Sequence, residues 1–454
     1  MMSLSEAANA IGAQNLGANV RFTSVSSDSR TLSPGALFVA LRGERFDGHG
    51  FIGSARMRGA AAAMVEERAA SSVGQSVLPF LVVDDTHLAL GRLAAHWRRR
   101  FDIPVIAVAG SNGKTTVKEM IAAILRAHCG ESSALATEGN LNNDIGLPLT
   151  LLRLRGEHRC AVIELGMNHP GETAFLAGIA AATVALVNNA QREHQEFMKG
   201  VADVAREHGA VFSALPPGGT AVINADDEFA DYWRGLAANR RIVDFGMNKP
   251  AQVGGRHAIA DFGSEIQLRT PAGSVSVALH IDGRHNVMNA FAAAAAAIAA
   301  GAGLAPVARG LEGFRAFKGR LQRKAGRSGS TIIDDSYNAN PDSVRAAIDV
   351  LANYPAPTVL VLGDMGEVGD QGPQFHREIG AYARSANISS LLGMGELTRH
   401  AVEAFGAAGA HANTIEGLLC MVRASATPQA TLLVKGSRFM RMERIVAALC
   451  EEGN

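Results

Sequence analysis

Short apolar runs separated by glycine and serine fill the first part of the chain, for example at residues 36–41. Runs of strand length with turn residues between them predict a small α/β domain up to about Asp84. The stretch 87–100 that follows has the apolar spacing of a helix.

In the middle of the chain, strand-length apolar runs alternate with longer periodic stretches. Residues 105–109 have strand length, and residues 116–127 have the apolar spacing of a helix. Further apolar runs at 161–163, 184–187 and 220–223 are each bounded by polar or glycine-containing segments. This rhythm predicts a mostly parallel sheet with helices on both faces.

The pattern changes between residues 243 and 282 to alternating polar and apolar positions, which predicts an antiparallel addition. Gly, Lys and Arg then cluster at 316–327, ahead of the strand-like run 331–333, and this cluster suggests a domain boundary. Two later runs, 358–362 and 431–434, lie between helical stretches and predict a second α/β domain. The predicted domains are residues 1–84, 85–316 and 317–454.

The composition is that of a multidomain globular protein, because 454 residues are too many for one hydrophobic core. The 43 basic residues equal the 43 acidic ones, so we expect small-molecule partners and no nucleic acid. The four cysteines have no Cys-x-x-Cys spacing, which argues against zinc and disulfides and favours a reducing cytoplasm. Residues 1–17 lack signal-peptide features and the Ala-rich stretch 291–300 is too short to cross a bilayer, so no membrane insertion is expected.

A glycine-rich segment, Gly110-Ser111-Asn112-Gly113-Lys114-Thr115-Thr116, lies between the predicted strand and the predicted helix. Backbone N–H groups and a helix N-terminus at such a turn can surround phosphate oxygens. Lys114 would place a charge between the β- and γ-phosphates, and the Thr115 hydroxyl could ligate Mg²⁺. We interpret the segment as a nucleotide site. The alternative is a plain strand-to-helix turn with a solvated lysine.

The loop departs from the generic phosphate-loop pattern, because Val108 stands where that pattern has a glycine five residues before Gly113. A GTPase is disfavoured because residues 248–251, Asn-Lys-Pro-Ala, lack the acidic fourth residue that would read guanine. The shortened loop instead resembles that of the Mur ligases and of their relative folylpolyglutamate synthetase.

Other segments are similar to the Mur ligases along most of the chain, and within the family they resemble the member that adds D-alanyl-D-alanine. These segments are Ser27-Asp28-Ser29-Arg30 with residues 34–49, then residues 137–148 (TEGNLNNDIGLP) and 334–341 (DDSYNANP).

The resemblance implies an α/β protein of three domains: an N-terminal UDP-sugar-binding domain, a central P-loop ATPase-like domain with a parallel sheet, and a C-terminal Rossmann-like domain. It implies a cytoplasmic ligase, expected to be a monomer, that uses ATP and Mg²⁺ to join D-alanyl-D-alanine to UDP-N-acetylmuramoyl-tripeptide in peptidoglycan precursor synthesis. The tripeptide carboxylate would become an acyl phosphate, which the dipeptide amine attacks. Domain closure would keep water away from this labile intermediate.

Three side chains would surround the transferred phosphate. Glu164 follows the predicted strand 161–163, so its carboxylate would emerge beside the phosphate loop and, by resemblance, ligate Mg²⁺; a surface carboxylate is the alternative. His194 resembles the family's second metal-proximal residue, although a lone histidine is more often structural. Arg320 resembles the arginine that reaches the γ-phosphate from the interdomain hinge, against the alternative of a solvated linker charge.

The family commonly has a lysine in the helix after that histidine, modified as a carbamate whose negative charge supports Mg²⁺. Aligning residues 204–209 on the family's segment puts His208 at the lysine position, and histidine cannot form a stable carbamate. Lys199 lies nearby but out of register. We therefore predict catalysis that does not depend on bicarbonate, with His208 working differently or another group supplying the charge.

Further roles follow from the resemblance. Asn286 would contact adenine, with a helix N-cap as the alternative, and Asp335 would bind ribose hydroxyls. Asn338 and Asn340 would orient the lid or form a turn. Residues 435–438 would lie on the substrate side. Residues 363–367 would either supply a carboxylate that receives the dipeptide ammonium or form an ordinary turn. The implied nucleotide-binding residues are Gly110, Ser111, Asn112, Gly113, Lys114, Thr115, Thr116, Asn286 and Asp335. The implied substrate-binding residues are Ser27, Asp28, Ser29, Arg30, Arg45, Thr137, Asn140, Asn142 and Asn143.

Two rival functions differ in what they require. A Mur ligase that adds a single amino acid, or a polyglutamate-adding relative, would share the chemistry, but the segment 28–49 argues against both. A P-loop NTPase that moves a partner would turn over ATP without peptide substrates, whereas the ligase needs both substrates.

Overall fold

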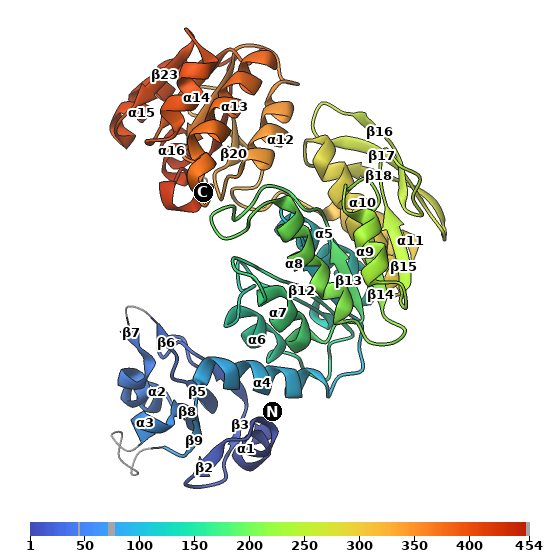
Figure 1. Ribbon diagram of the computed structural model, residues 1–454, viewed down its shortest axis with the longest axis vertical. Helices are drawn as coiled ribbons and strands as arrows, with labels where there is room; N and C mark the ends of the chain where they lie inside the picture. Colours follow the sequence, from blue (N-terminus) through green and yellow to red (C-terminus); the bar gives the residue numbers. More distant parts are fainter. Residues whose placement is uncertain (44–45, 71–77, 451–454) are drawn as a thin grey trace.

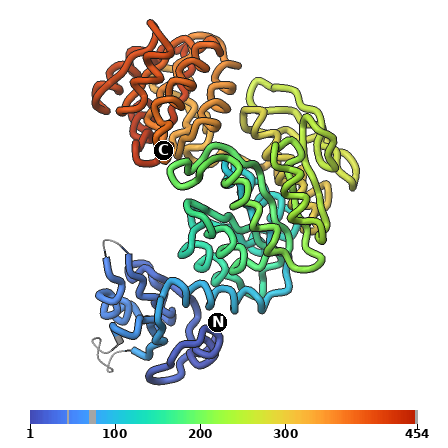
Figure 2. Tube along the Cα trace, viewed as in Figure 1, coloured from blue at the N-terminus to red at the C-terminus, as the bar shows by residue number. Residues whose placement is uncertain are grey.

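Three α/β units follow one another along the chain in the computed structural model, which describes residues 1–43, 46–70 and 78–450. The N-terminal and C-terminal units lie at opposite ends of the central unit (Figure 1). Figure 2 shows that the order in space is the order in sequence, from blue through green and yellow to red. The central unit is therefore the one that both others can contact.

The N-terminal unit is built on a five-stranded sheet in the order β2-β9-β8-β5-β4, which is parallel except where β2 pairs with β9. Its inner strands are buried along their length, as continuous apolar runs predict. The strands of this unit are β1 (Met2–Ser3), β2 (Gln14–Leu16), β3 (Arg21–Phe22), β4 (Ser24–Ser26), β5 (Ala36–Val39), β6 (Arg42–Gly43), β7 (Phe46–Asp47), β8 (Ala62–Glu66) and β9 (Phe80–Val83). Its helices are α1 (Leu4–Ile11), the 3₁₀ turn η1 (Gly48–Phe51), α2 (Ile52–Met57) and α3 (Glu67–Ala70).

One helix, α4 (Thr86–Arg98), joins the N-terminal unit to the central one. It packs against α1 on one side and against α6 (Gly146–Leu151) and α7 (Glu172–Ala180) on the other. The indole of Trp97 is buried there and donates a hydrogen bond to the Leu154 carbonyl at 3.1 Å. Apolar packing thus continues from the N-terminal sheet into the central unit.

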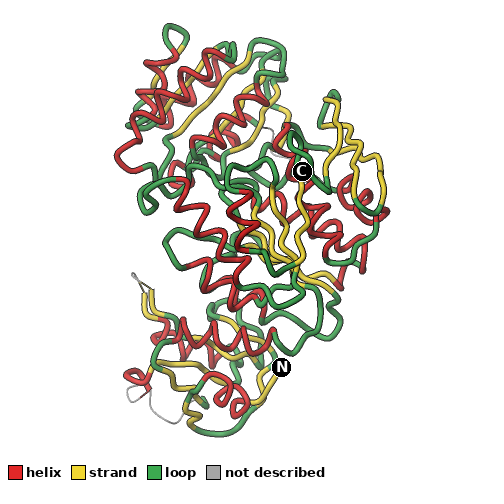
Figure 3. The backbone as a smooth tube through the Cα atoms, turned by 45° about the vertical axis from the view of Figure 1, so that its right-hand side comes forward, coloured by secondary structure: helices red, strands yellow, loops and turns green. Residues whose placement is uncertain are grey.

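The central sheet has six parallel strands in the order β11-β12-β10-β13-β14-β15. One face packs on α5, α10 and α11 and the other on α4, α6, α7 and α8, so the predicted parallel sheet covered on both faces is confirmed (Figure 3). The strands are β10 (Val105–Ala109), β11 (Ala134–Ala136), β12 (Cys160–Glu164), β13 (Val184–Val187), β14 (Thr220–Asn224) and β15 (Arg241–Phe245). The remaining helices are α5 (Lys114–Cys129), η2 (Glu131–Ser133), α8 (Val201–Ser213), α9 (Ala230–Leu236), α10 (Arg284–Ala299) and α11 (Leu304–Gly313).

The predicted antiparallel addition is a three-stranded sheet that packs beside α10 and α11. Its strands are β16 (Gly254–Ile259), β17 (Ser264–Thr270) and β18 (Gly273–Leu279), and alternate residues of β17 are buried and exposed. The alanines of α10 from Ala290 to Ala297 are fully buried between this sheet and α5. Among the helices that the structure describes, none is long and apolar enough to cross a membrane.

The C-terminal unit contains a second six-stranded sheet in the order β19-β20-β24-β21-β22-β23, parallel except for β19. Its strands are β19 (Gln322–Ala325), β20 (Thr331–Asp335), β21 (Thr358–Gly363), β22 (Ser390–Met394), β23 (Gly409–Ala412) and β24 (Thr431–Lys435). Its helices are α12 (Pro341–Leu351), η3 (Gly369–Gln371), α13 (Gly372–Ser385), α14 (Thr398–Phe405), α15 (Ile415–Ser425), η4 (Arg438–Met440) and α16 (Glu443–Leu449).

Candidate active site

The predicted phosphate loop leaves β10 at Ala109 and enters α5 at Lys114. Gly110 and Gly113 have φ values of +132° and +81°, which side chains with a Cβ rarely adopt. A Cβ on Gly113 would also lie 2.6 Å from Asn289 Oδ1 and 2.8 Å from Asn188 Nδ2. The loop is therefore folded tightly onto two buried amides, with the N-terminus of a long helix at its end.

The Lys114 ammonium lies at the mouth of this loop. Its Nζ donates to the carbonyl oxygens of Gly110 at 2.5 Å and Ser111 at 3.2 Å, and it lies 3.4 Å from Glu193 Oε2. The side chain is 16% exposed, so it is close to the surface of the cavity that it faces. This position fits a cation that contacts the outer phosphates of a nucleotide.

Glu164 lies beside the loop, at the carboxyl end of β12. Its Oε1 accepts hydrogen bonds from the Thr115 hydroxyl at 3.2 Å and from Asn142 Nδ2 at 2.9 Å, whereas its buried Oε2 has no partner among the described residues. A buried, unpartnered carboxylate oxygen next to a hydroxyl is a donor set that suits Mg²⁺, which takes one or two carboxylates and completes its shell with phosphates and water. In the described part of the chain, no three His, Cys, Asp or Glu side chains form a ready-made metal cluster, so nucleotide phosphates would have to complete the site.

His194 bridges the central and C-terminal units. Its Nδ1 lies 2.6 Å from Glu367 Oε2, in the turn after β21, and its Nε2 lies 3.6 Å from Glu193 Oε2. The close approach of the His194 ring holds the pKa of the Glu367 carboxyl below its usual range. Within the described residues no hydrogen bond or ion pair joins His194 to Glu164, although both line the same cavity. The structure therefore brings His194 to the cavity but not into contact with the expected metal ligands.

A buried carboxylate that sequence reasoning missed stands behind Lys114 and His194. Glu193 Oε1 lies 2.7 Å from Nε2 of His208, on α8. Burial alone would raise the pKa of the Glu193 carboxyl, but Lys114, the hydrogen bond from His208 and His194 lower it to about 2. The carboxylate is ionised at neutral pH.

Arg320 lies in the segment between α11 and β19, at the border of two cavities. Its guanidinium stacks on the Tyr337 ring, 4.3 Å from the ring centroid. Asp335 is bound from two sides, since Oδ1 accepts from the Leu321 N–H at 3.2 Å and Oδ2 from Lys435 Nζ at 2.5 Å. Both Arg320 and Asp335 line the larger cavity.

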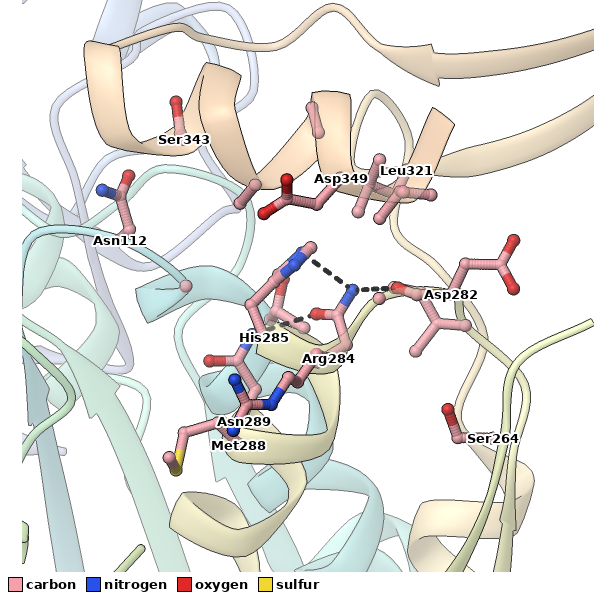
Figure 4. Close-up of a pocket in the computed structure, with 18 of the residues that line it drawn as sticks. Asn112, Ser264, Asp282, Arg284, His285, Met288, Asn289, Leu321, Ser343 and Asp349 are labelled. Carbon is pink, nitrogen blue, oxygen red and sulfur yellow. Dashed lines mark hydrogen bonds between the residues drawn. The ribbon is translucent and has the colours of Figure 1, made fainter. Parts of the chain in front are cut away.

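The larger cavity, of about 1120 Å³, opens beyond the loop toward α10 and α12 (Figure 4). Asn286 Nδ2 donates to the Asp282 carbonyl at 2.7 Å, and Asn286 Oδ1 accepts from Asn289 Nδ2 at 3.0 Å. The N-cap of α10 is Gly283, so the alternative role of Asn286 as a helix cap is wrong. Burial lowers the pKa of the neighbouring His285 to about 4, so this imidazole is neutral at pH 7. The α10 wall of the cavity thus presents amides and a neutral ring, and charged side chains such as Arg320 and Asp335 line other parts of it.

A smaller cavity, of about 670 Å³, lies on the other side of the loop. Asn140, Asn142 and Asn143 line it, together with Lys114 and Thr115. Asn338 and Asn340 enter it from the C-terminal unit, as do Glu367 and Arg438. Thr137 is buried behind this cavity, where its hydroxyl accepts a hydrogen bond from the Glu164 N–H at 3.0 Å.

The candidate residues of the N-terminal unit lie apart from both cavities. The Asp28 carboxylate accepts from the Arg30 backbone at 2.8 Å and from its guanidinium, and the hydrogen bonds from Arg30 lower the pKa of the Asp28 carboxyl to about 2. This pair organises a surface turn that also contains Ser27 and Ser29. Arg45 lies outside the described residues.

Polar contacts close the C-terminal unit onto the phosphate loop. Asn112 exchanges hydrogen bonds with Asn340, the N-cap of α12, at 2.9 and 3.2 Å. Arg192 donates to Asp342 at 2.8 Å and to Glu378 at 2.8 Å. Arg192 belongs to the segment that follows β13, residues 188–194. The rule that identified Glu164, polar residues directly after a buried strand, would have found it.

Comparison with known proteins agrees with this arrangement. Family models described as "Mur ligase family, catalytic domain", "Mur ligase middle domain" and "Mur ligase, glutamate ligase domain" match residues 21–98, 108–297 and 319–438. UDP-N-acetylmuramoyl-tripeptide–D-alanyl-D-alanine ligases are 41% identical (Escherichia coli, 100% of this chain and 99% of that one) and 37% identical (Haemophilus influenzae, 95% and 94%). A crystal structure of MurF from Acinetobacter baumannii superposes with a TM-score of 0.90 at 35% identity, covering 98% of this chain and 97% of that one.

Proposed function

The chain belongs to the Mur ligase family, and from that premise we propose that it is the ATP-dependent ligase that joins D-alanyl-D-alanine to a UDP-N-acetylmuramoyl-tripeptide in peptidoglycan synthesis. One observation in the structure carries the proposal. The Lys114 ammonium lies at the mouth of a loop that borders two cavities, one suited to a nucleotide and the other lined by charged groups from two units. A phosphoryl group held at the loop can therefore be transferred to an acceptor that is bound in the smaller cavity.

The residues around the loop would stabilise charge on the phosphoryl group as it moves. Lys114 would neutralise the outer phosphate oxygens, and Arg320 would leave the Tyr337 ring to reach them when the nucleotide binds. Mg²⁺, when bound, would neutralise further charge, and Thr115 and Glu164 are the residues that would hold it. Asn142 and Thr137 position Glu164 through hydrogen bonds to its carboxylate and its backbone.

Two bond exchanges then make the amide. An oxygen of the tripeptide's terminal carboxylate attacks the γ-phosphorus, and the bond to ADP breaks. The free amine of D-alanyl-D-alanine attacks the acyl carbon, phosphate leaves, and the amine proton passes to solvent. Residues of the C-terminal unit, among them Glu367, line the cavity in which this exchange would take place, so closure of that unit would exclude water.

We assign the UDP-sugar to the N-terminal unit, where Ser27, Asp28, Ser29 and Arg30 form an exposed, hydrogen-bonded turn. The tripeptide would extend from there toward Asn140, Asn142 and Asn143. Asn286 and Asp335 would contact the adenosine part of ATP from the larger cavity. We also propose that the protein acts as a monomer in the cytoplasm, where these substrates and the reduced cysteines would coexist.

A single assay tests the function. Purified protein is given ATP, Mg²⁺, D-alanyl-D-alanine and UDP-linked tripeptides that differ at the third residue, and the products are weighed by mass spectrometry. We expect ADP formation only when both peptide substrates are present, and a Lys114→Ala variant slower by about 1000-fold or more because it lacks the charge at the outer phosphate. ATP turnover without either peptide, or full amide synthesis by folded Lys114→Ala, would contradict the proposal.

A further inference from the structure

Glu193 is a charged side chain buried at the edge of the smaller cavity, and the proposed mechanism gives it no task. Its residue is 7% exposed, and its two carboxylate oxygens face different partners. Oε2 faces Lys114 Nζ at 3.4 Å and His194 Nε2 at 3.6 Å, whereas Oε1 faces His208 at 2.7 Å. Burying a carboxylate costs free energy unless it is paired, so these contacts define a specific place for the charge.

His208 holds that carboxylate from the interior side. It is 1% exposed on α8, and its Nδ1 is buried without a hydrogen-bond partner among the described residues. Because an ionised carboxylate only accepts hydrogen bonds, Nε2 of His208 carries the proton in the contact with Glu193. The imidazole therefore makes its polar contact on the side that faces the phosphate loop, and it fixes the direction of the Glu193 side chain.

We infer that Glu193, held in place by His208, is the fixed negative charge that positions Lys114 and balances the cations of this site, so that the chain needs no charge derived from carbon dioxide. The inference rests on the proposed function, because it assigns this charge to phosphoryl transfer. Glu193 is a positioning residue, since it acts on the outermost phosphate through Lys114 and His194.

Charge accounts for this role. Lys114 and a divalent cation would concentrate positive charge beside the loop, and a buried carboxylate 3.4 Å from the ammonium keeps Lys114 directed into the loop mouth. Lys199, the other candidate near this position, is exposed, and its backbone N–H is bound by Asp203 at 3.1 Å at the start of α8. Glu193 already lies where the charge is needed.

The first experiment removes the charge and keeps the shape. In carbonate-free buffer we expect Glu193→Gln to lower kcat about 100-fold, with the KM for the tripeptide changed less than about threefold. Calorimetry supplies a readout besides activity. The factor by which Mg²⁺ increases the affinity for ADP should fall about tenfold in the variant. The affinity for ADP without Mg²⁺ should stay at the wild-type value, which shows that the variant is folded. Glu196→Gln removes the same charge from an exposed position three residues later, and this matched control should behave as wild type.

The second experiment moves the charge. Glu193→Ala combined with His208→Lys offers an amine that can react with carbon dioxide, forming an N–C bond and releasing a proton to solvent, which gives a carbamate near the empty carboxylate position. We expect bicarbonate to raise the rate of this double variant at least about tenfold and to leave wild type and Lys199→Arg unchanged.

The outcomes separate the two proposals. If wild type makes no amide, the proposed function fails. If wild type is active but bicarbonate stimulates it, or if Glu193→Gln keeps its full kcat, the assignment of Glu193 is wrong while the function stands. If Glu193→Ala loses activity while Glu193→Gln keeps it, Glu193 serves packing and its charge is not required.

Discussion

The two cavities that meet at the phosphate loop are made of different chemistry. The larger is lined on its α10 side by the amides of Asn286 and Asn289 and the neutral imidazole of His285, with the single charge of Arg284 at the start of the helix. The smaller contains the carboxylates Glu164 and Glu193 with the ammonium of Lys114. Neutral hydrogen-bonding groups hold a ligand without responding to charge that develops during a reaction, whereas charged groups stabilise it. The comparison leads us to expect that nucleotide binding and phosphate transfer depend on different side chains, on opposite sides of the phosphate loop.

The largest effect that would sharpen this comparison is expected on the charged side. Glu164→Gln keeps the shape of the side chain but removes its charge, so kcat should fall by about 100- to 1000-fold. ADP affinity measured without Mg²⁺ should not change, because Glu164 lines only the smaller cavity. Initial rates and calorimetry check both statements. A variant that lost ADP affinity and kept its kcat would show that the two cavities do not have separate roles.

A smaller effect is expected where the C-terminal unit is held in place. Arg192→Ala removes the guanidinium that contacts Asp342 and Glu378, and the unit should then spend less time closed. We expect kcat/KM to fall about tenfold, with both constants affected, because closure aligns the reactants. Steady-state kinetics with each substrate measures this. Arg206→Ala, whose partner Asp203 lies on the same helix, is the control and should have wild-type constants.

The smallest effect is expected on the neutral side. Asn286→Ala removes one amide from the larger cavity, and the loss of about 1 kcal/mol of hydrogen bonding should raise the KM for ATP about fivefold. Its kcat should stay within about twofold of wild type, since no charge is removed. Titration of ATP at saturating peptide substrates gives both constants, and the exposed Asn239→Ala serves as control. A change confined to kcat would show that Asn286 acts in phosphate transfer and not in nucleotide binding.

Regular elements could be predicted from the sequence where an apolar run continued without interruption. Residues 105–109 and 184–187 were predicted with the bounds that the structure has, because a buried parallel strand is apolar at every position. The phosphate loop followed from glycine spacing and the charge of Lys114. Local pattern was sufficient in these places.

Contacts that depend on three-dimensional packing could not be read in the same way. The amide pair of Asn112 and Asn340 joins residues 228 positions apart, and each asparagine alone fits an ordinary turn. His208 was placed by alignment, but its partner Glu193 comes from a loop whose course no periodicity predicts.

Arg192, Glu193 and His194 are neighbours in sequence, and they alternate in direction: Arg192 and His194 contact Asp342 and Glu367 of the C-terminal unit, whereas Glu193 faces Lys114 in the central unit. Separation of the two units would break the contacts of Arg192 and His194 and would disturb Glu193 between them. We therefore expect the reaction centre to be complete only when the units are together, so that ATP hydrolysis without the peptide substrates is slow.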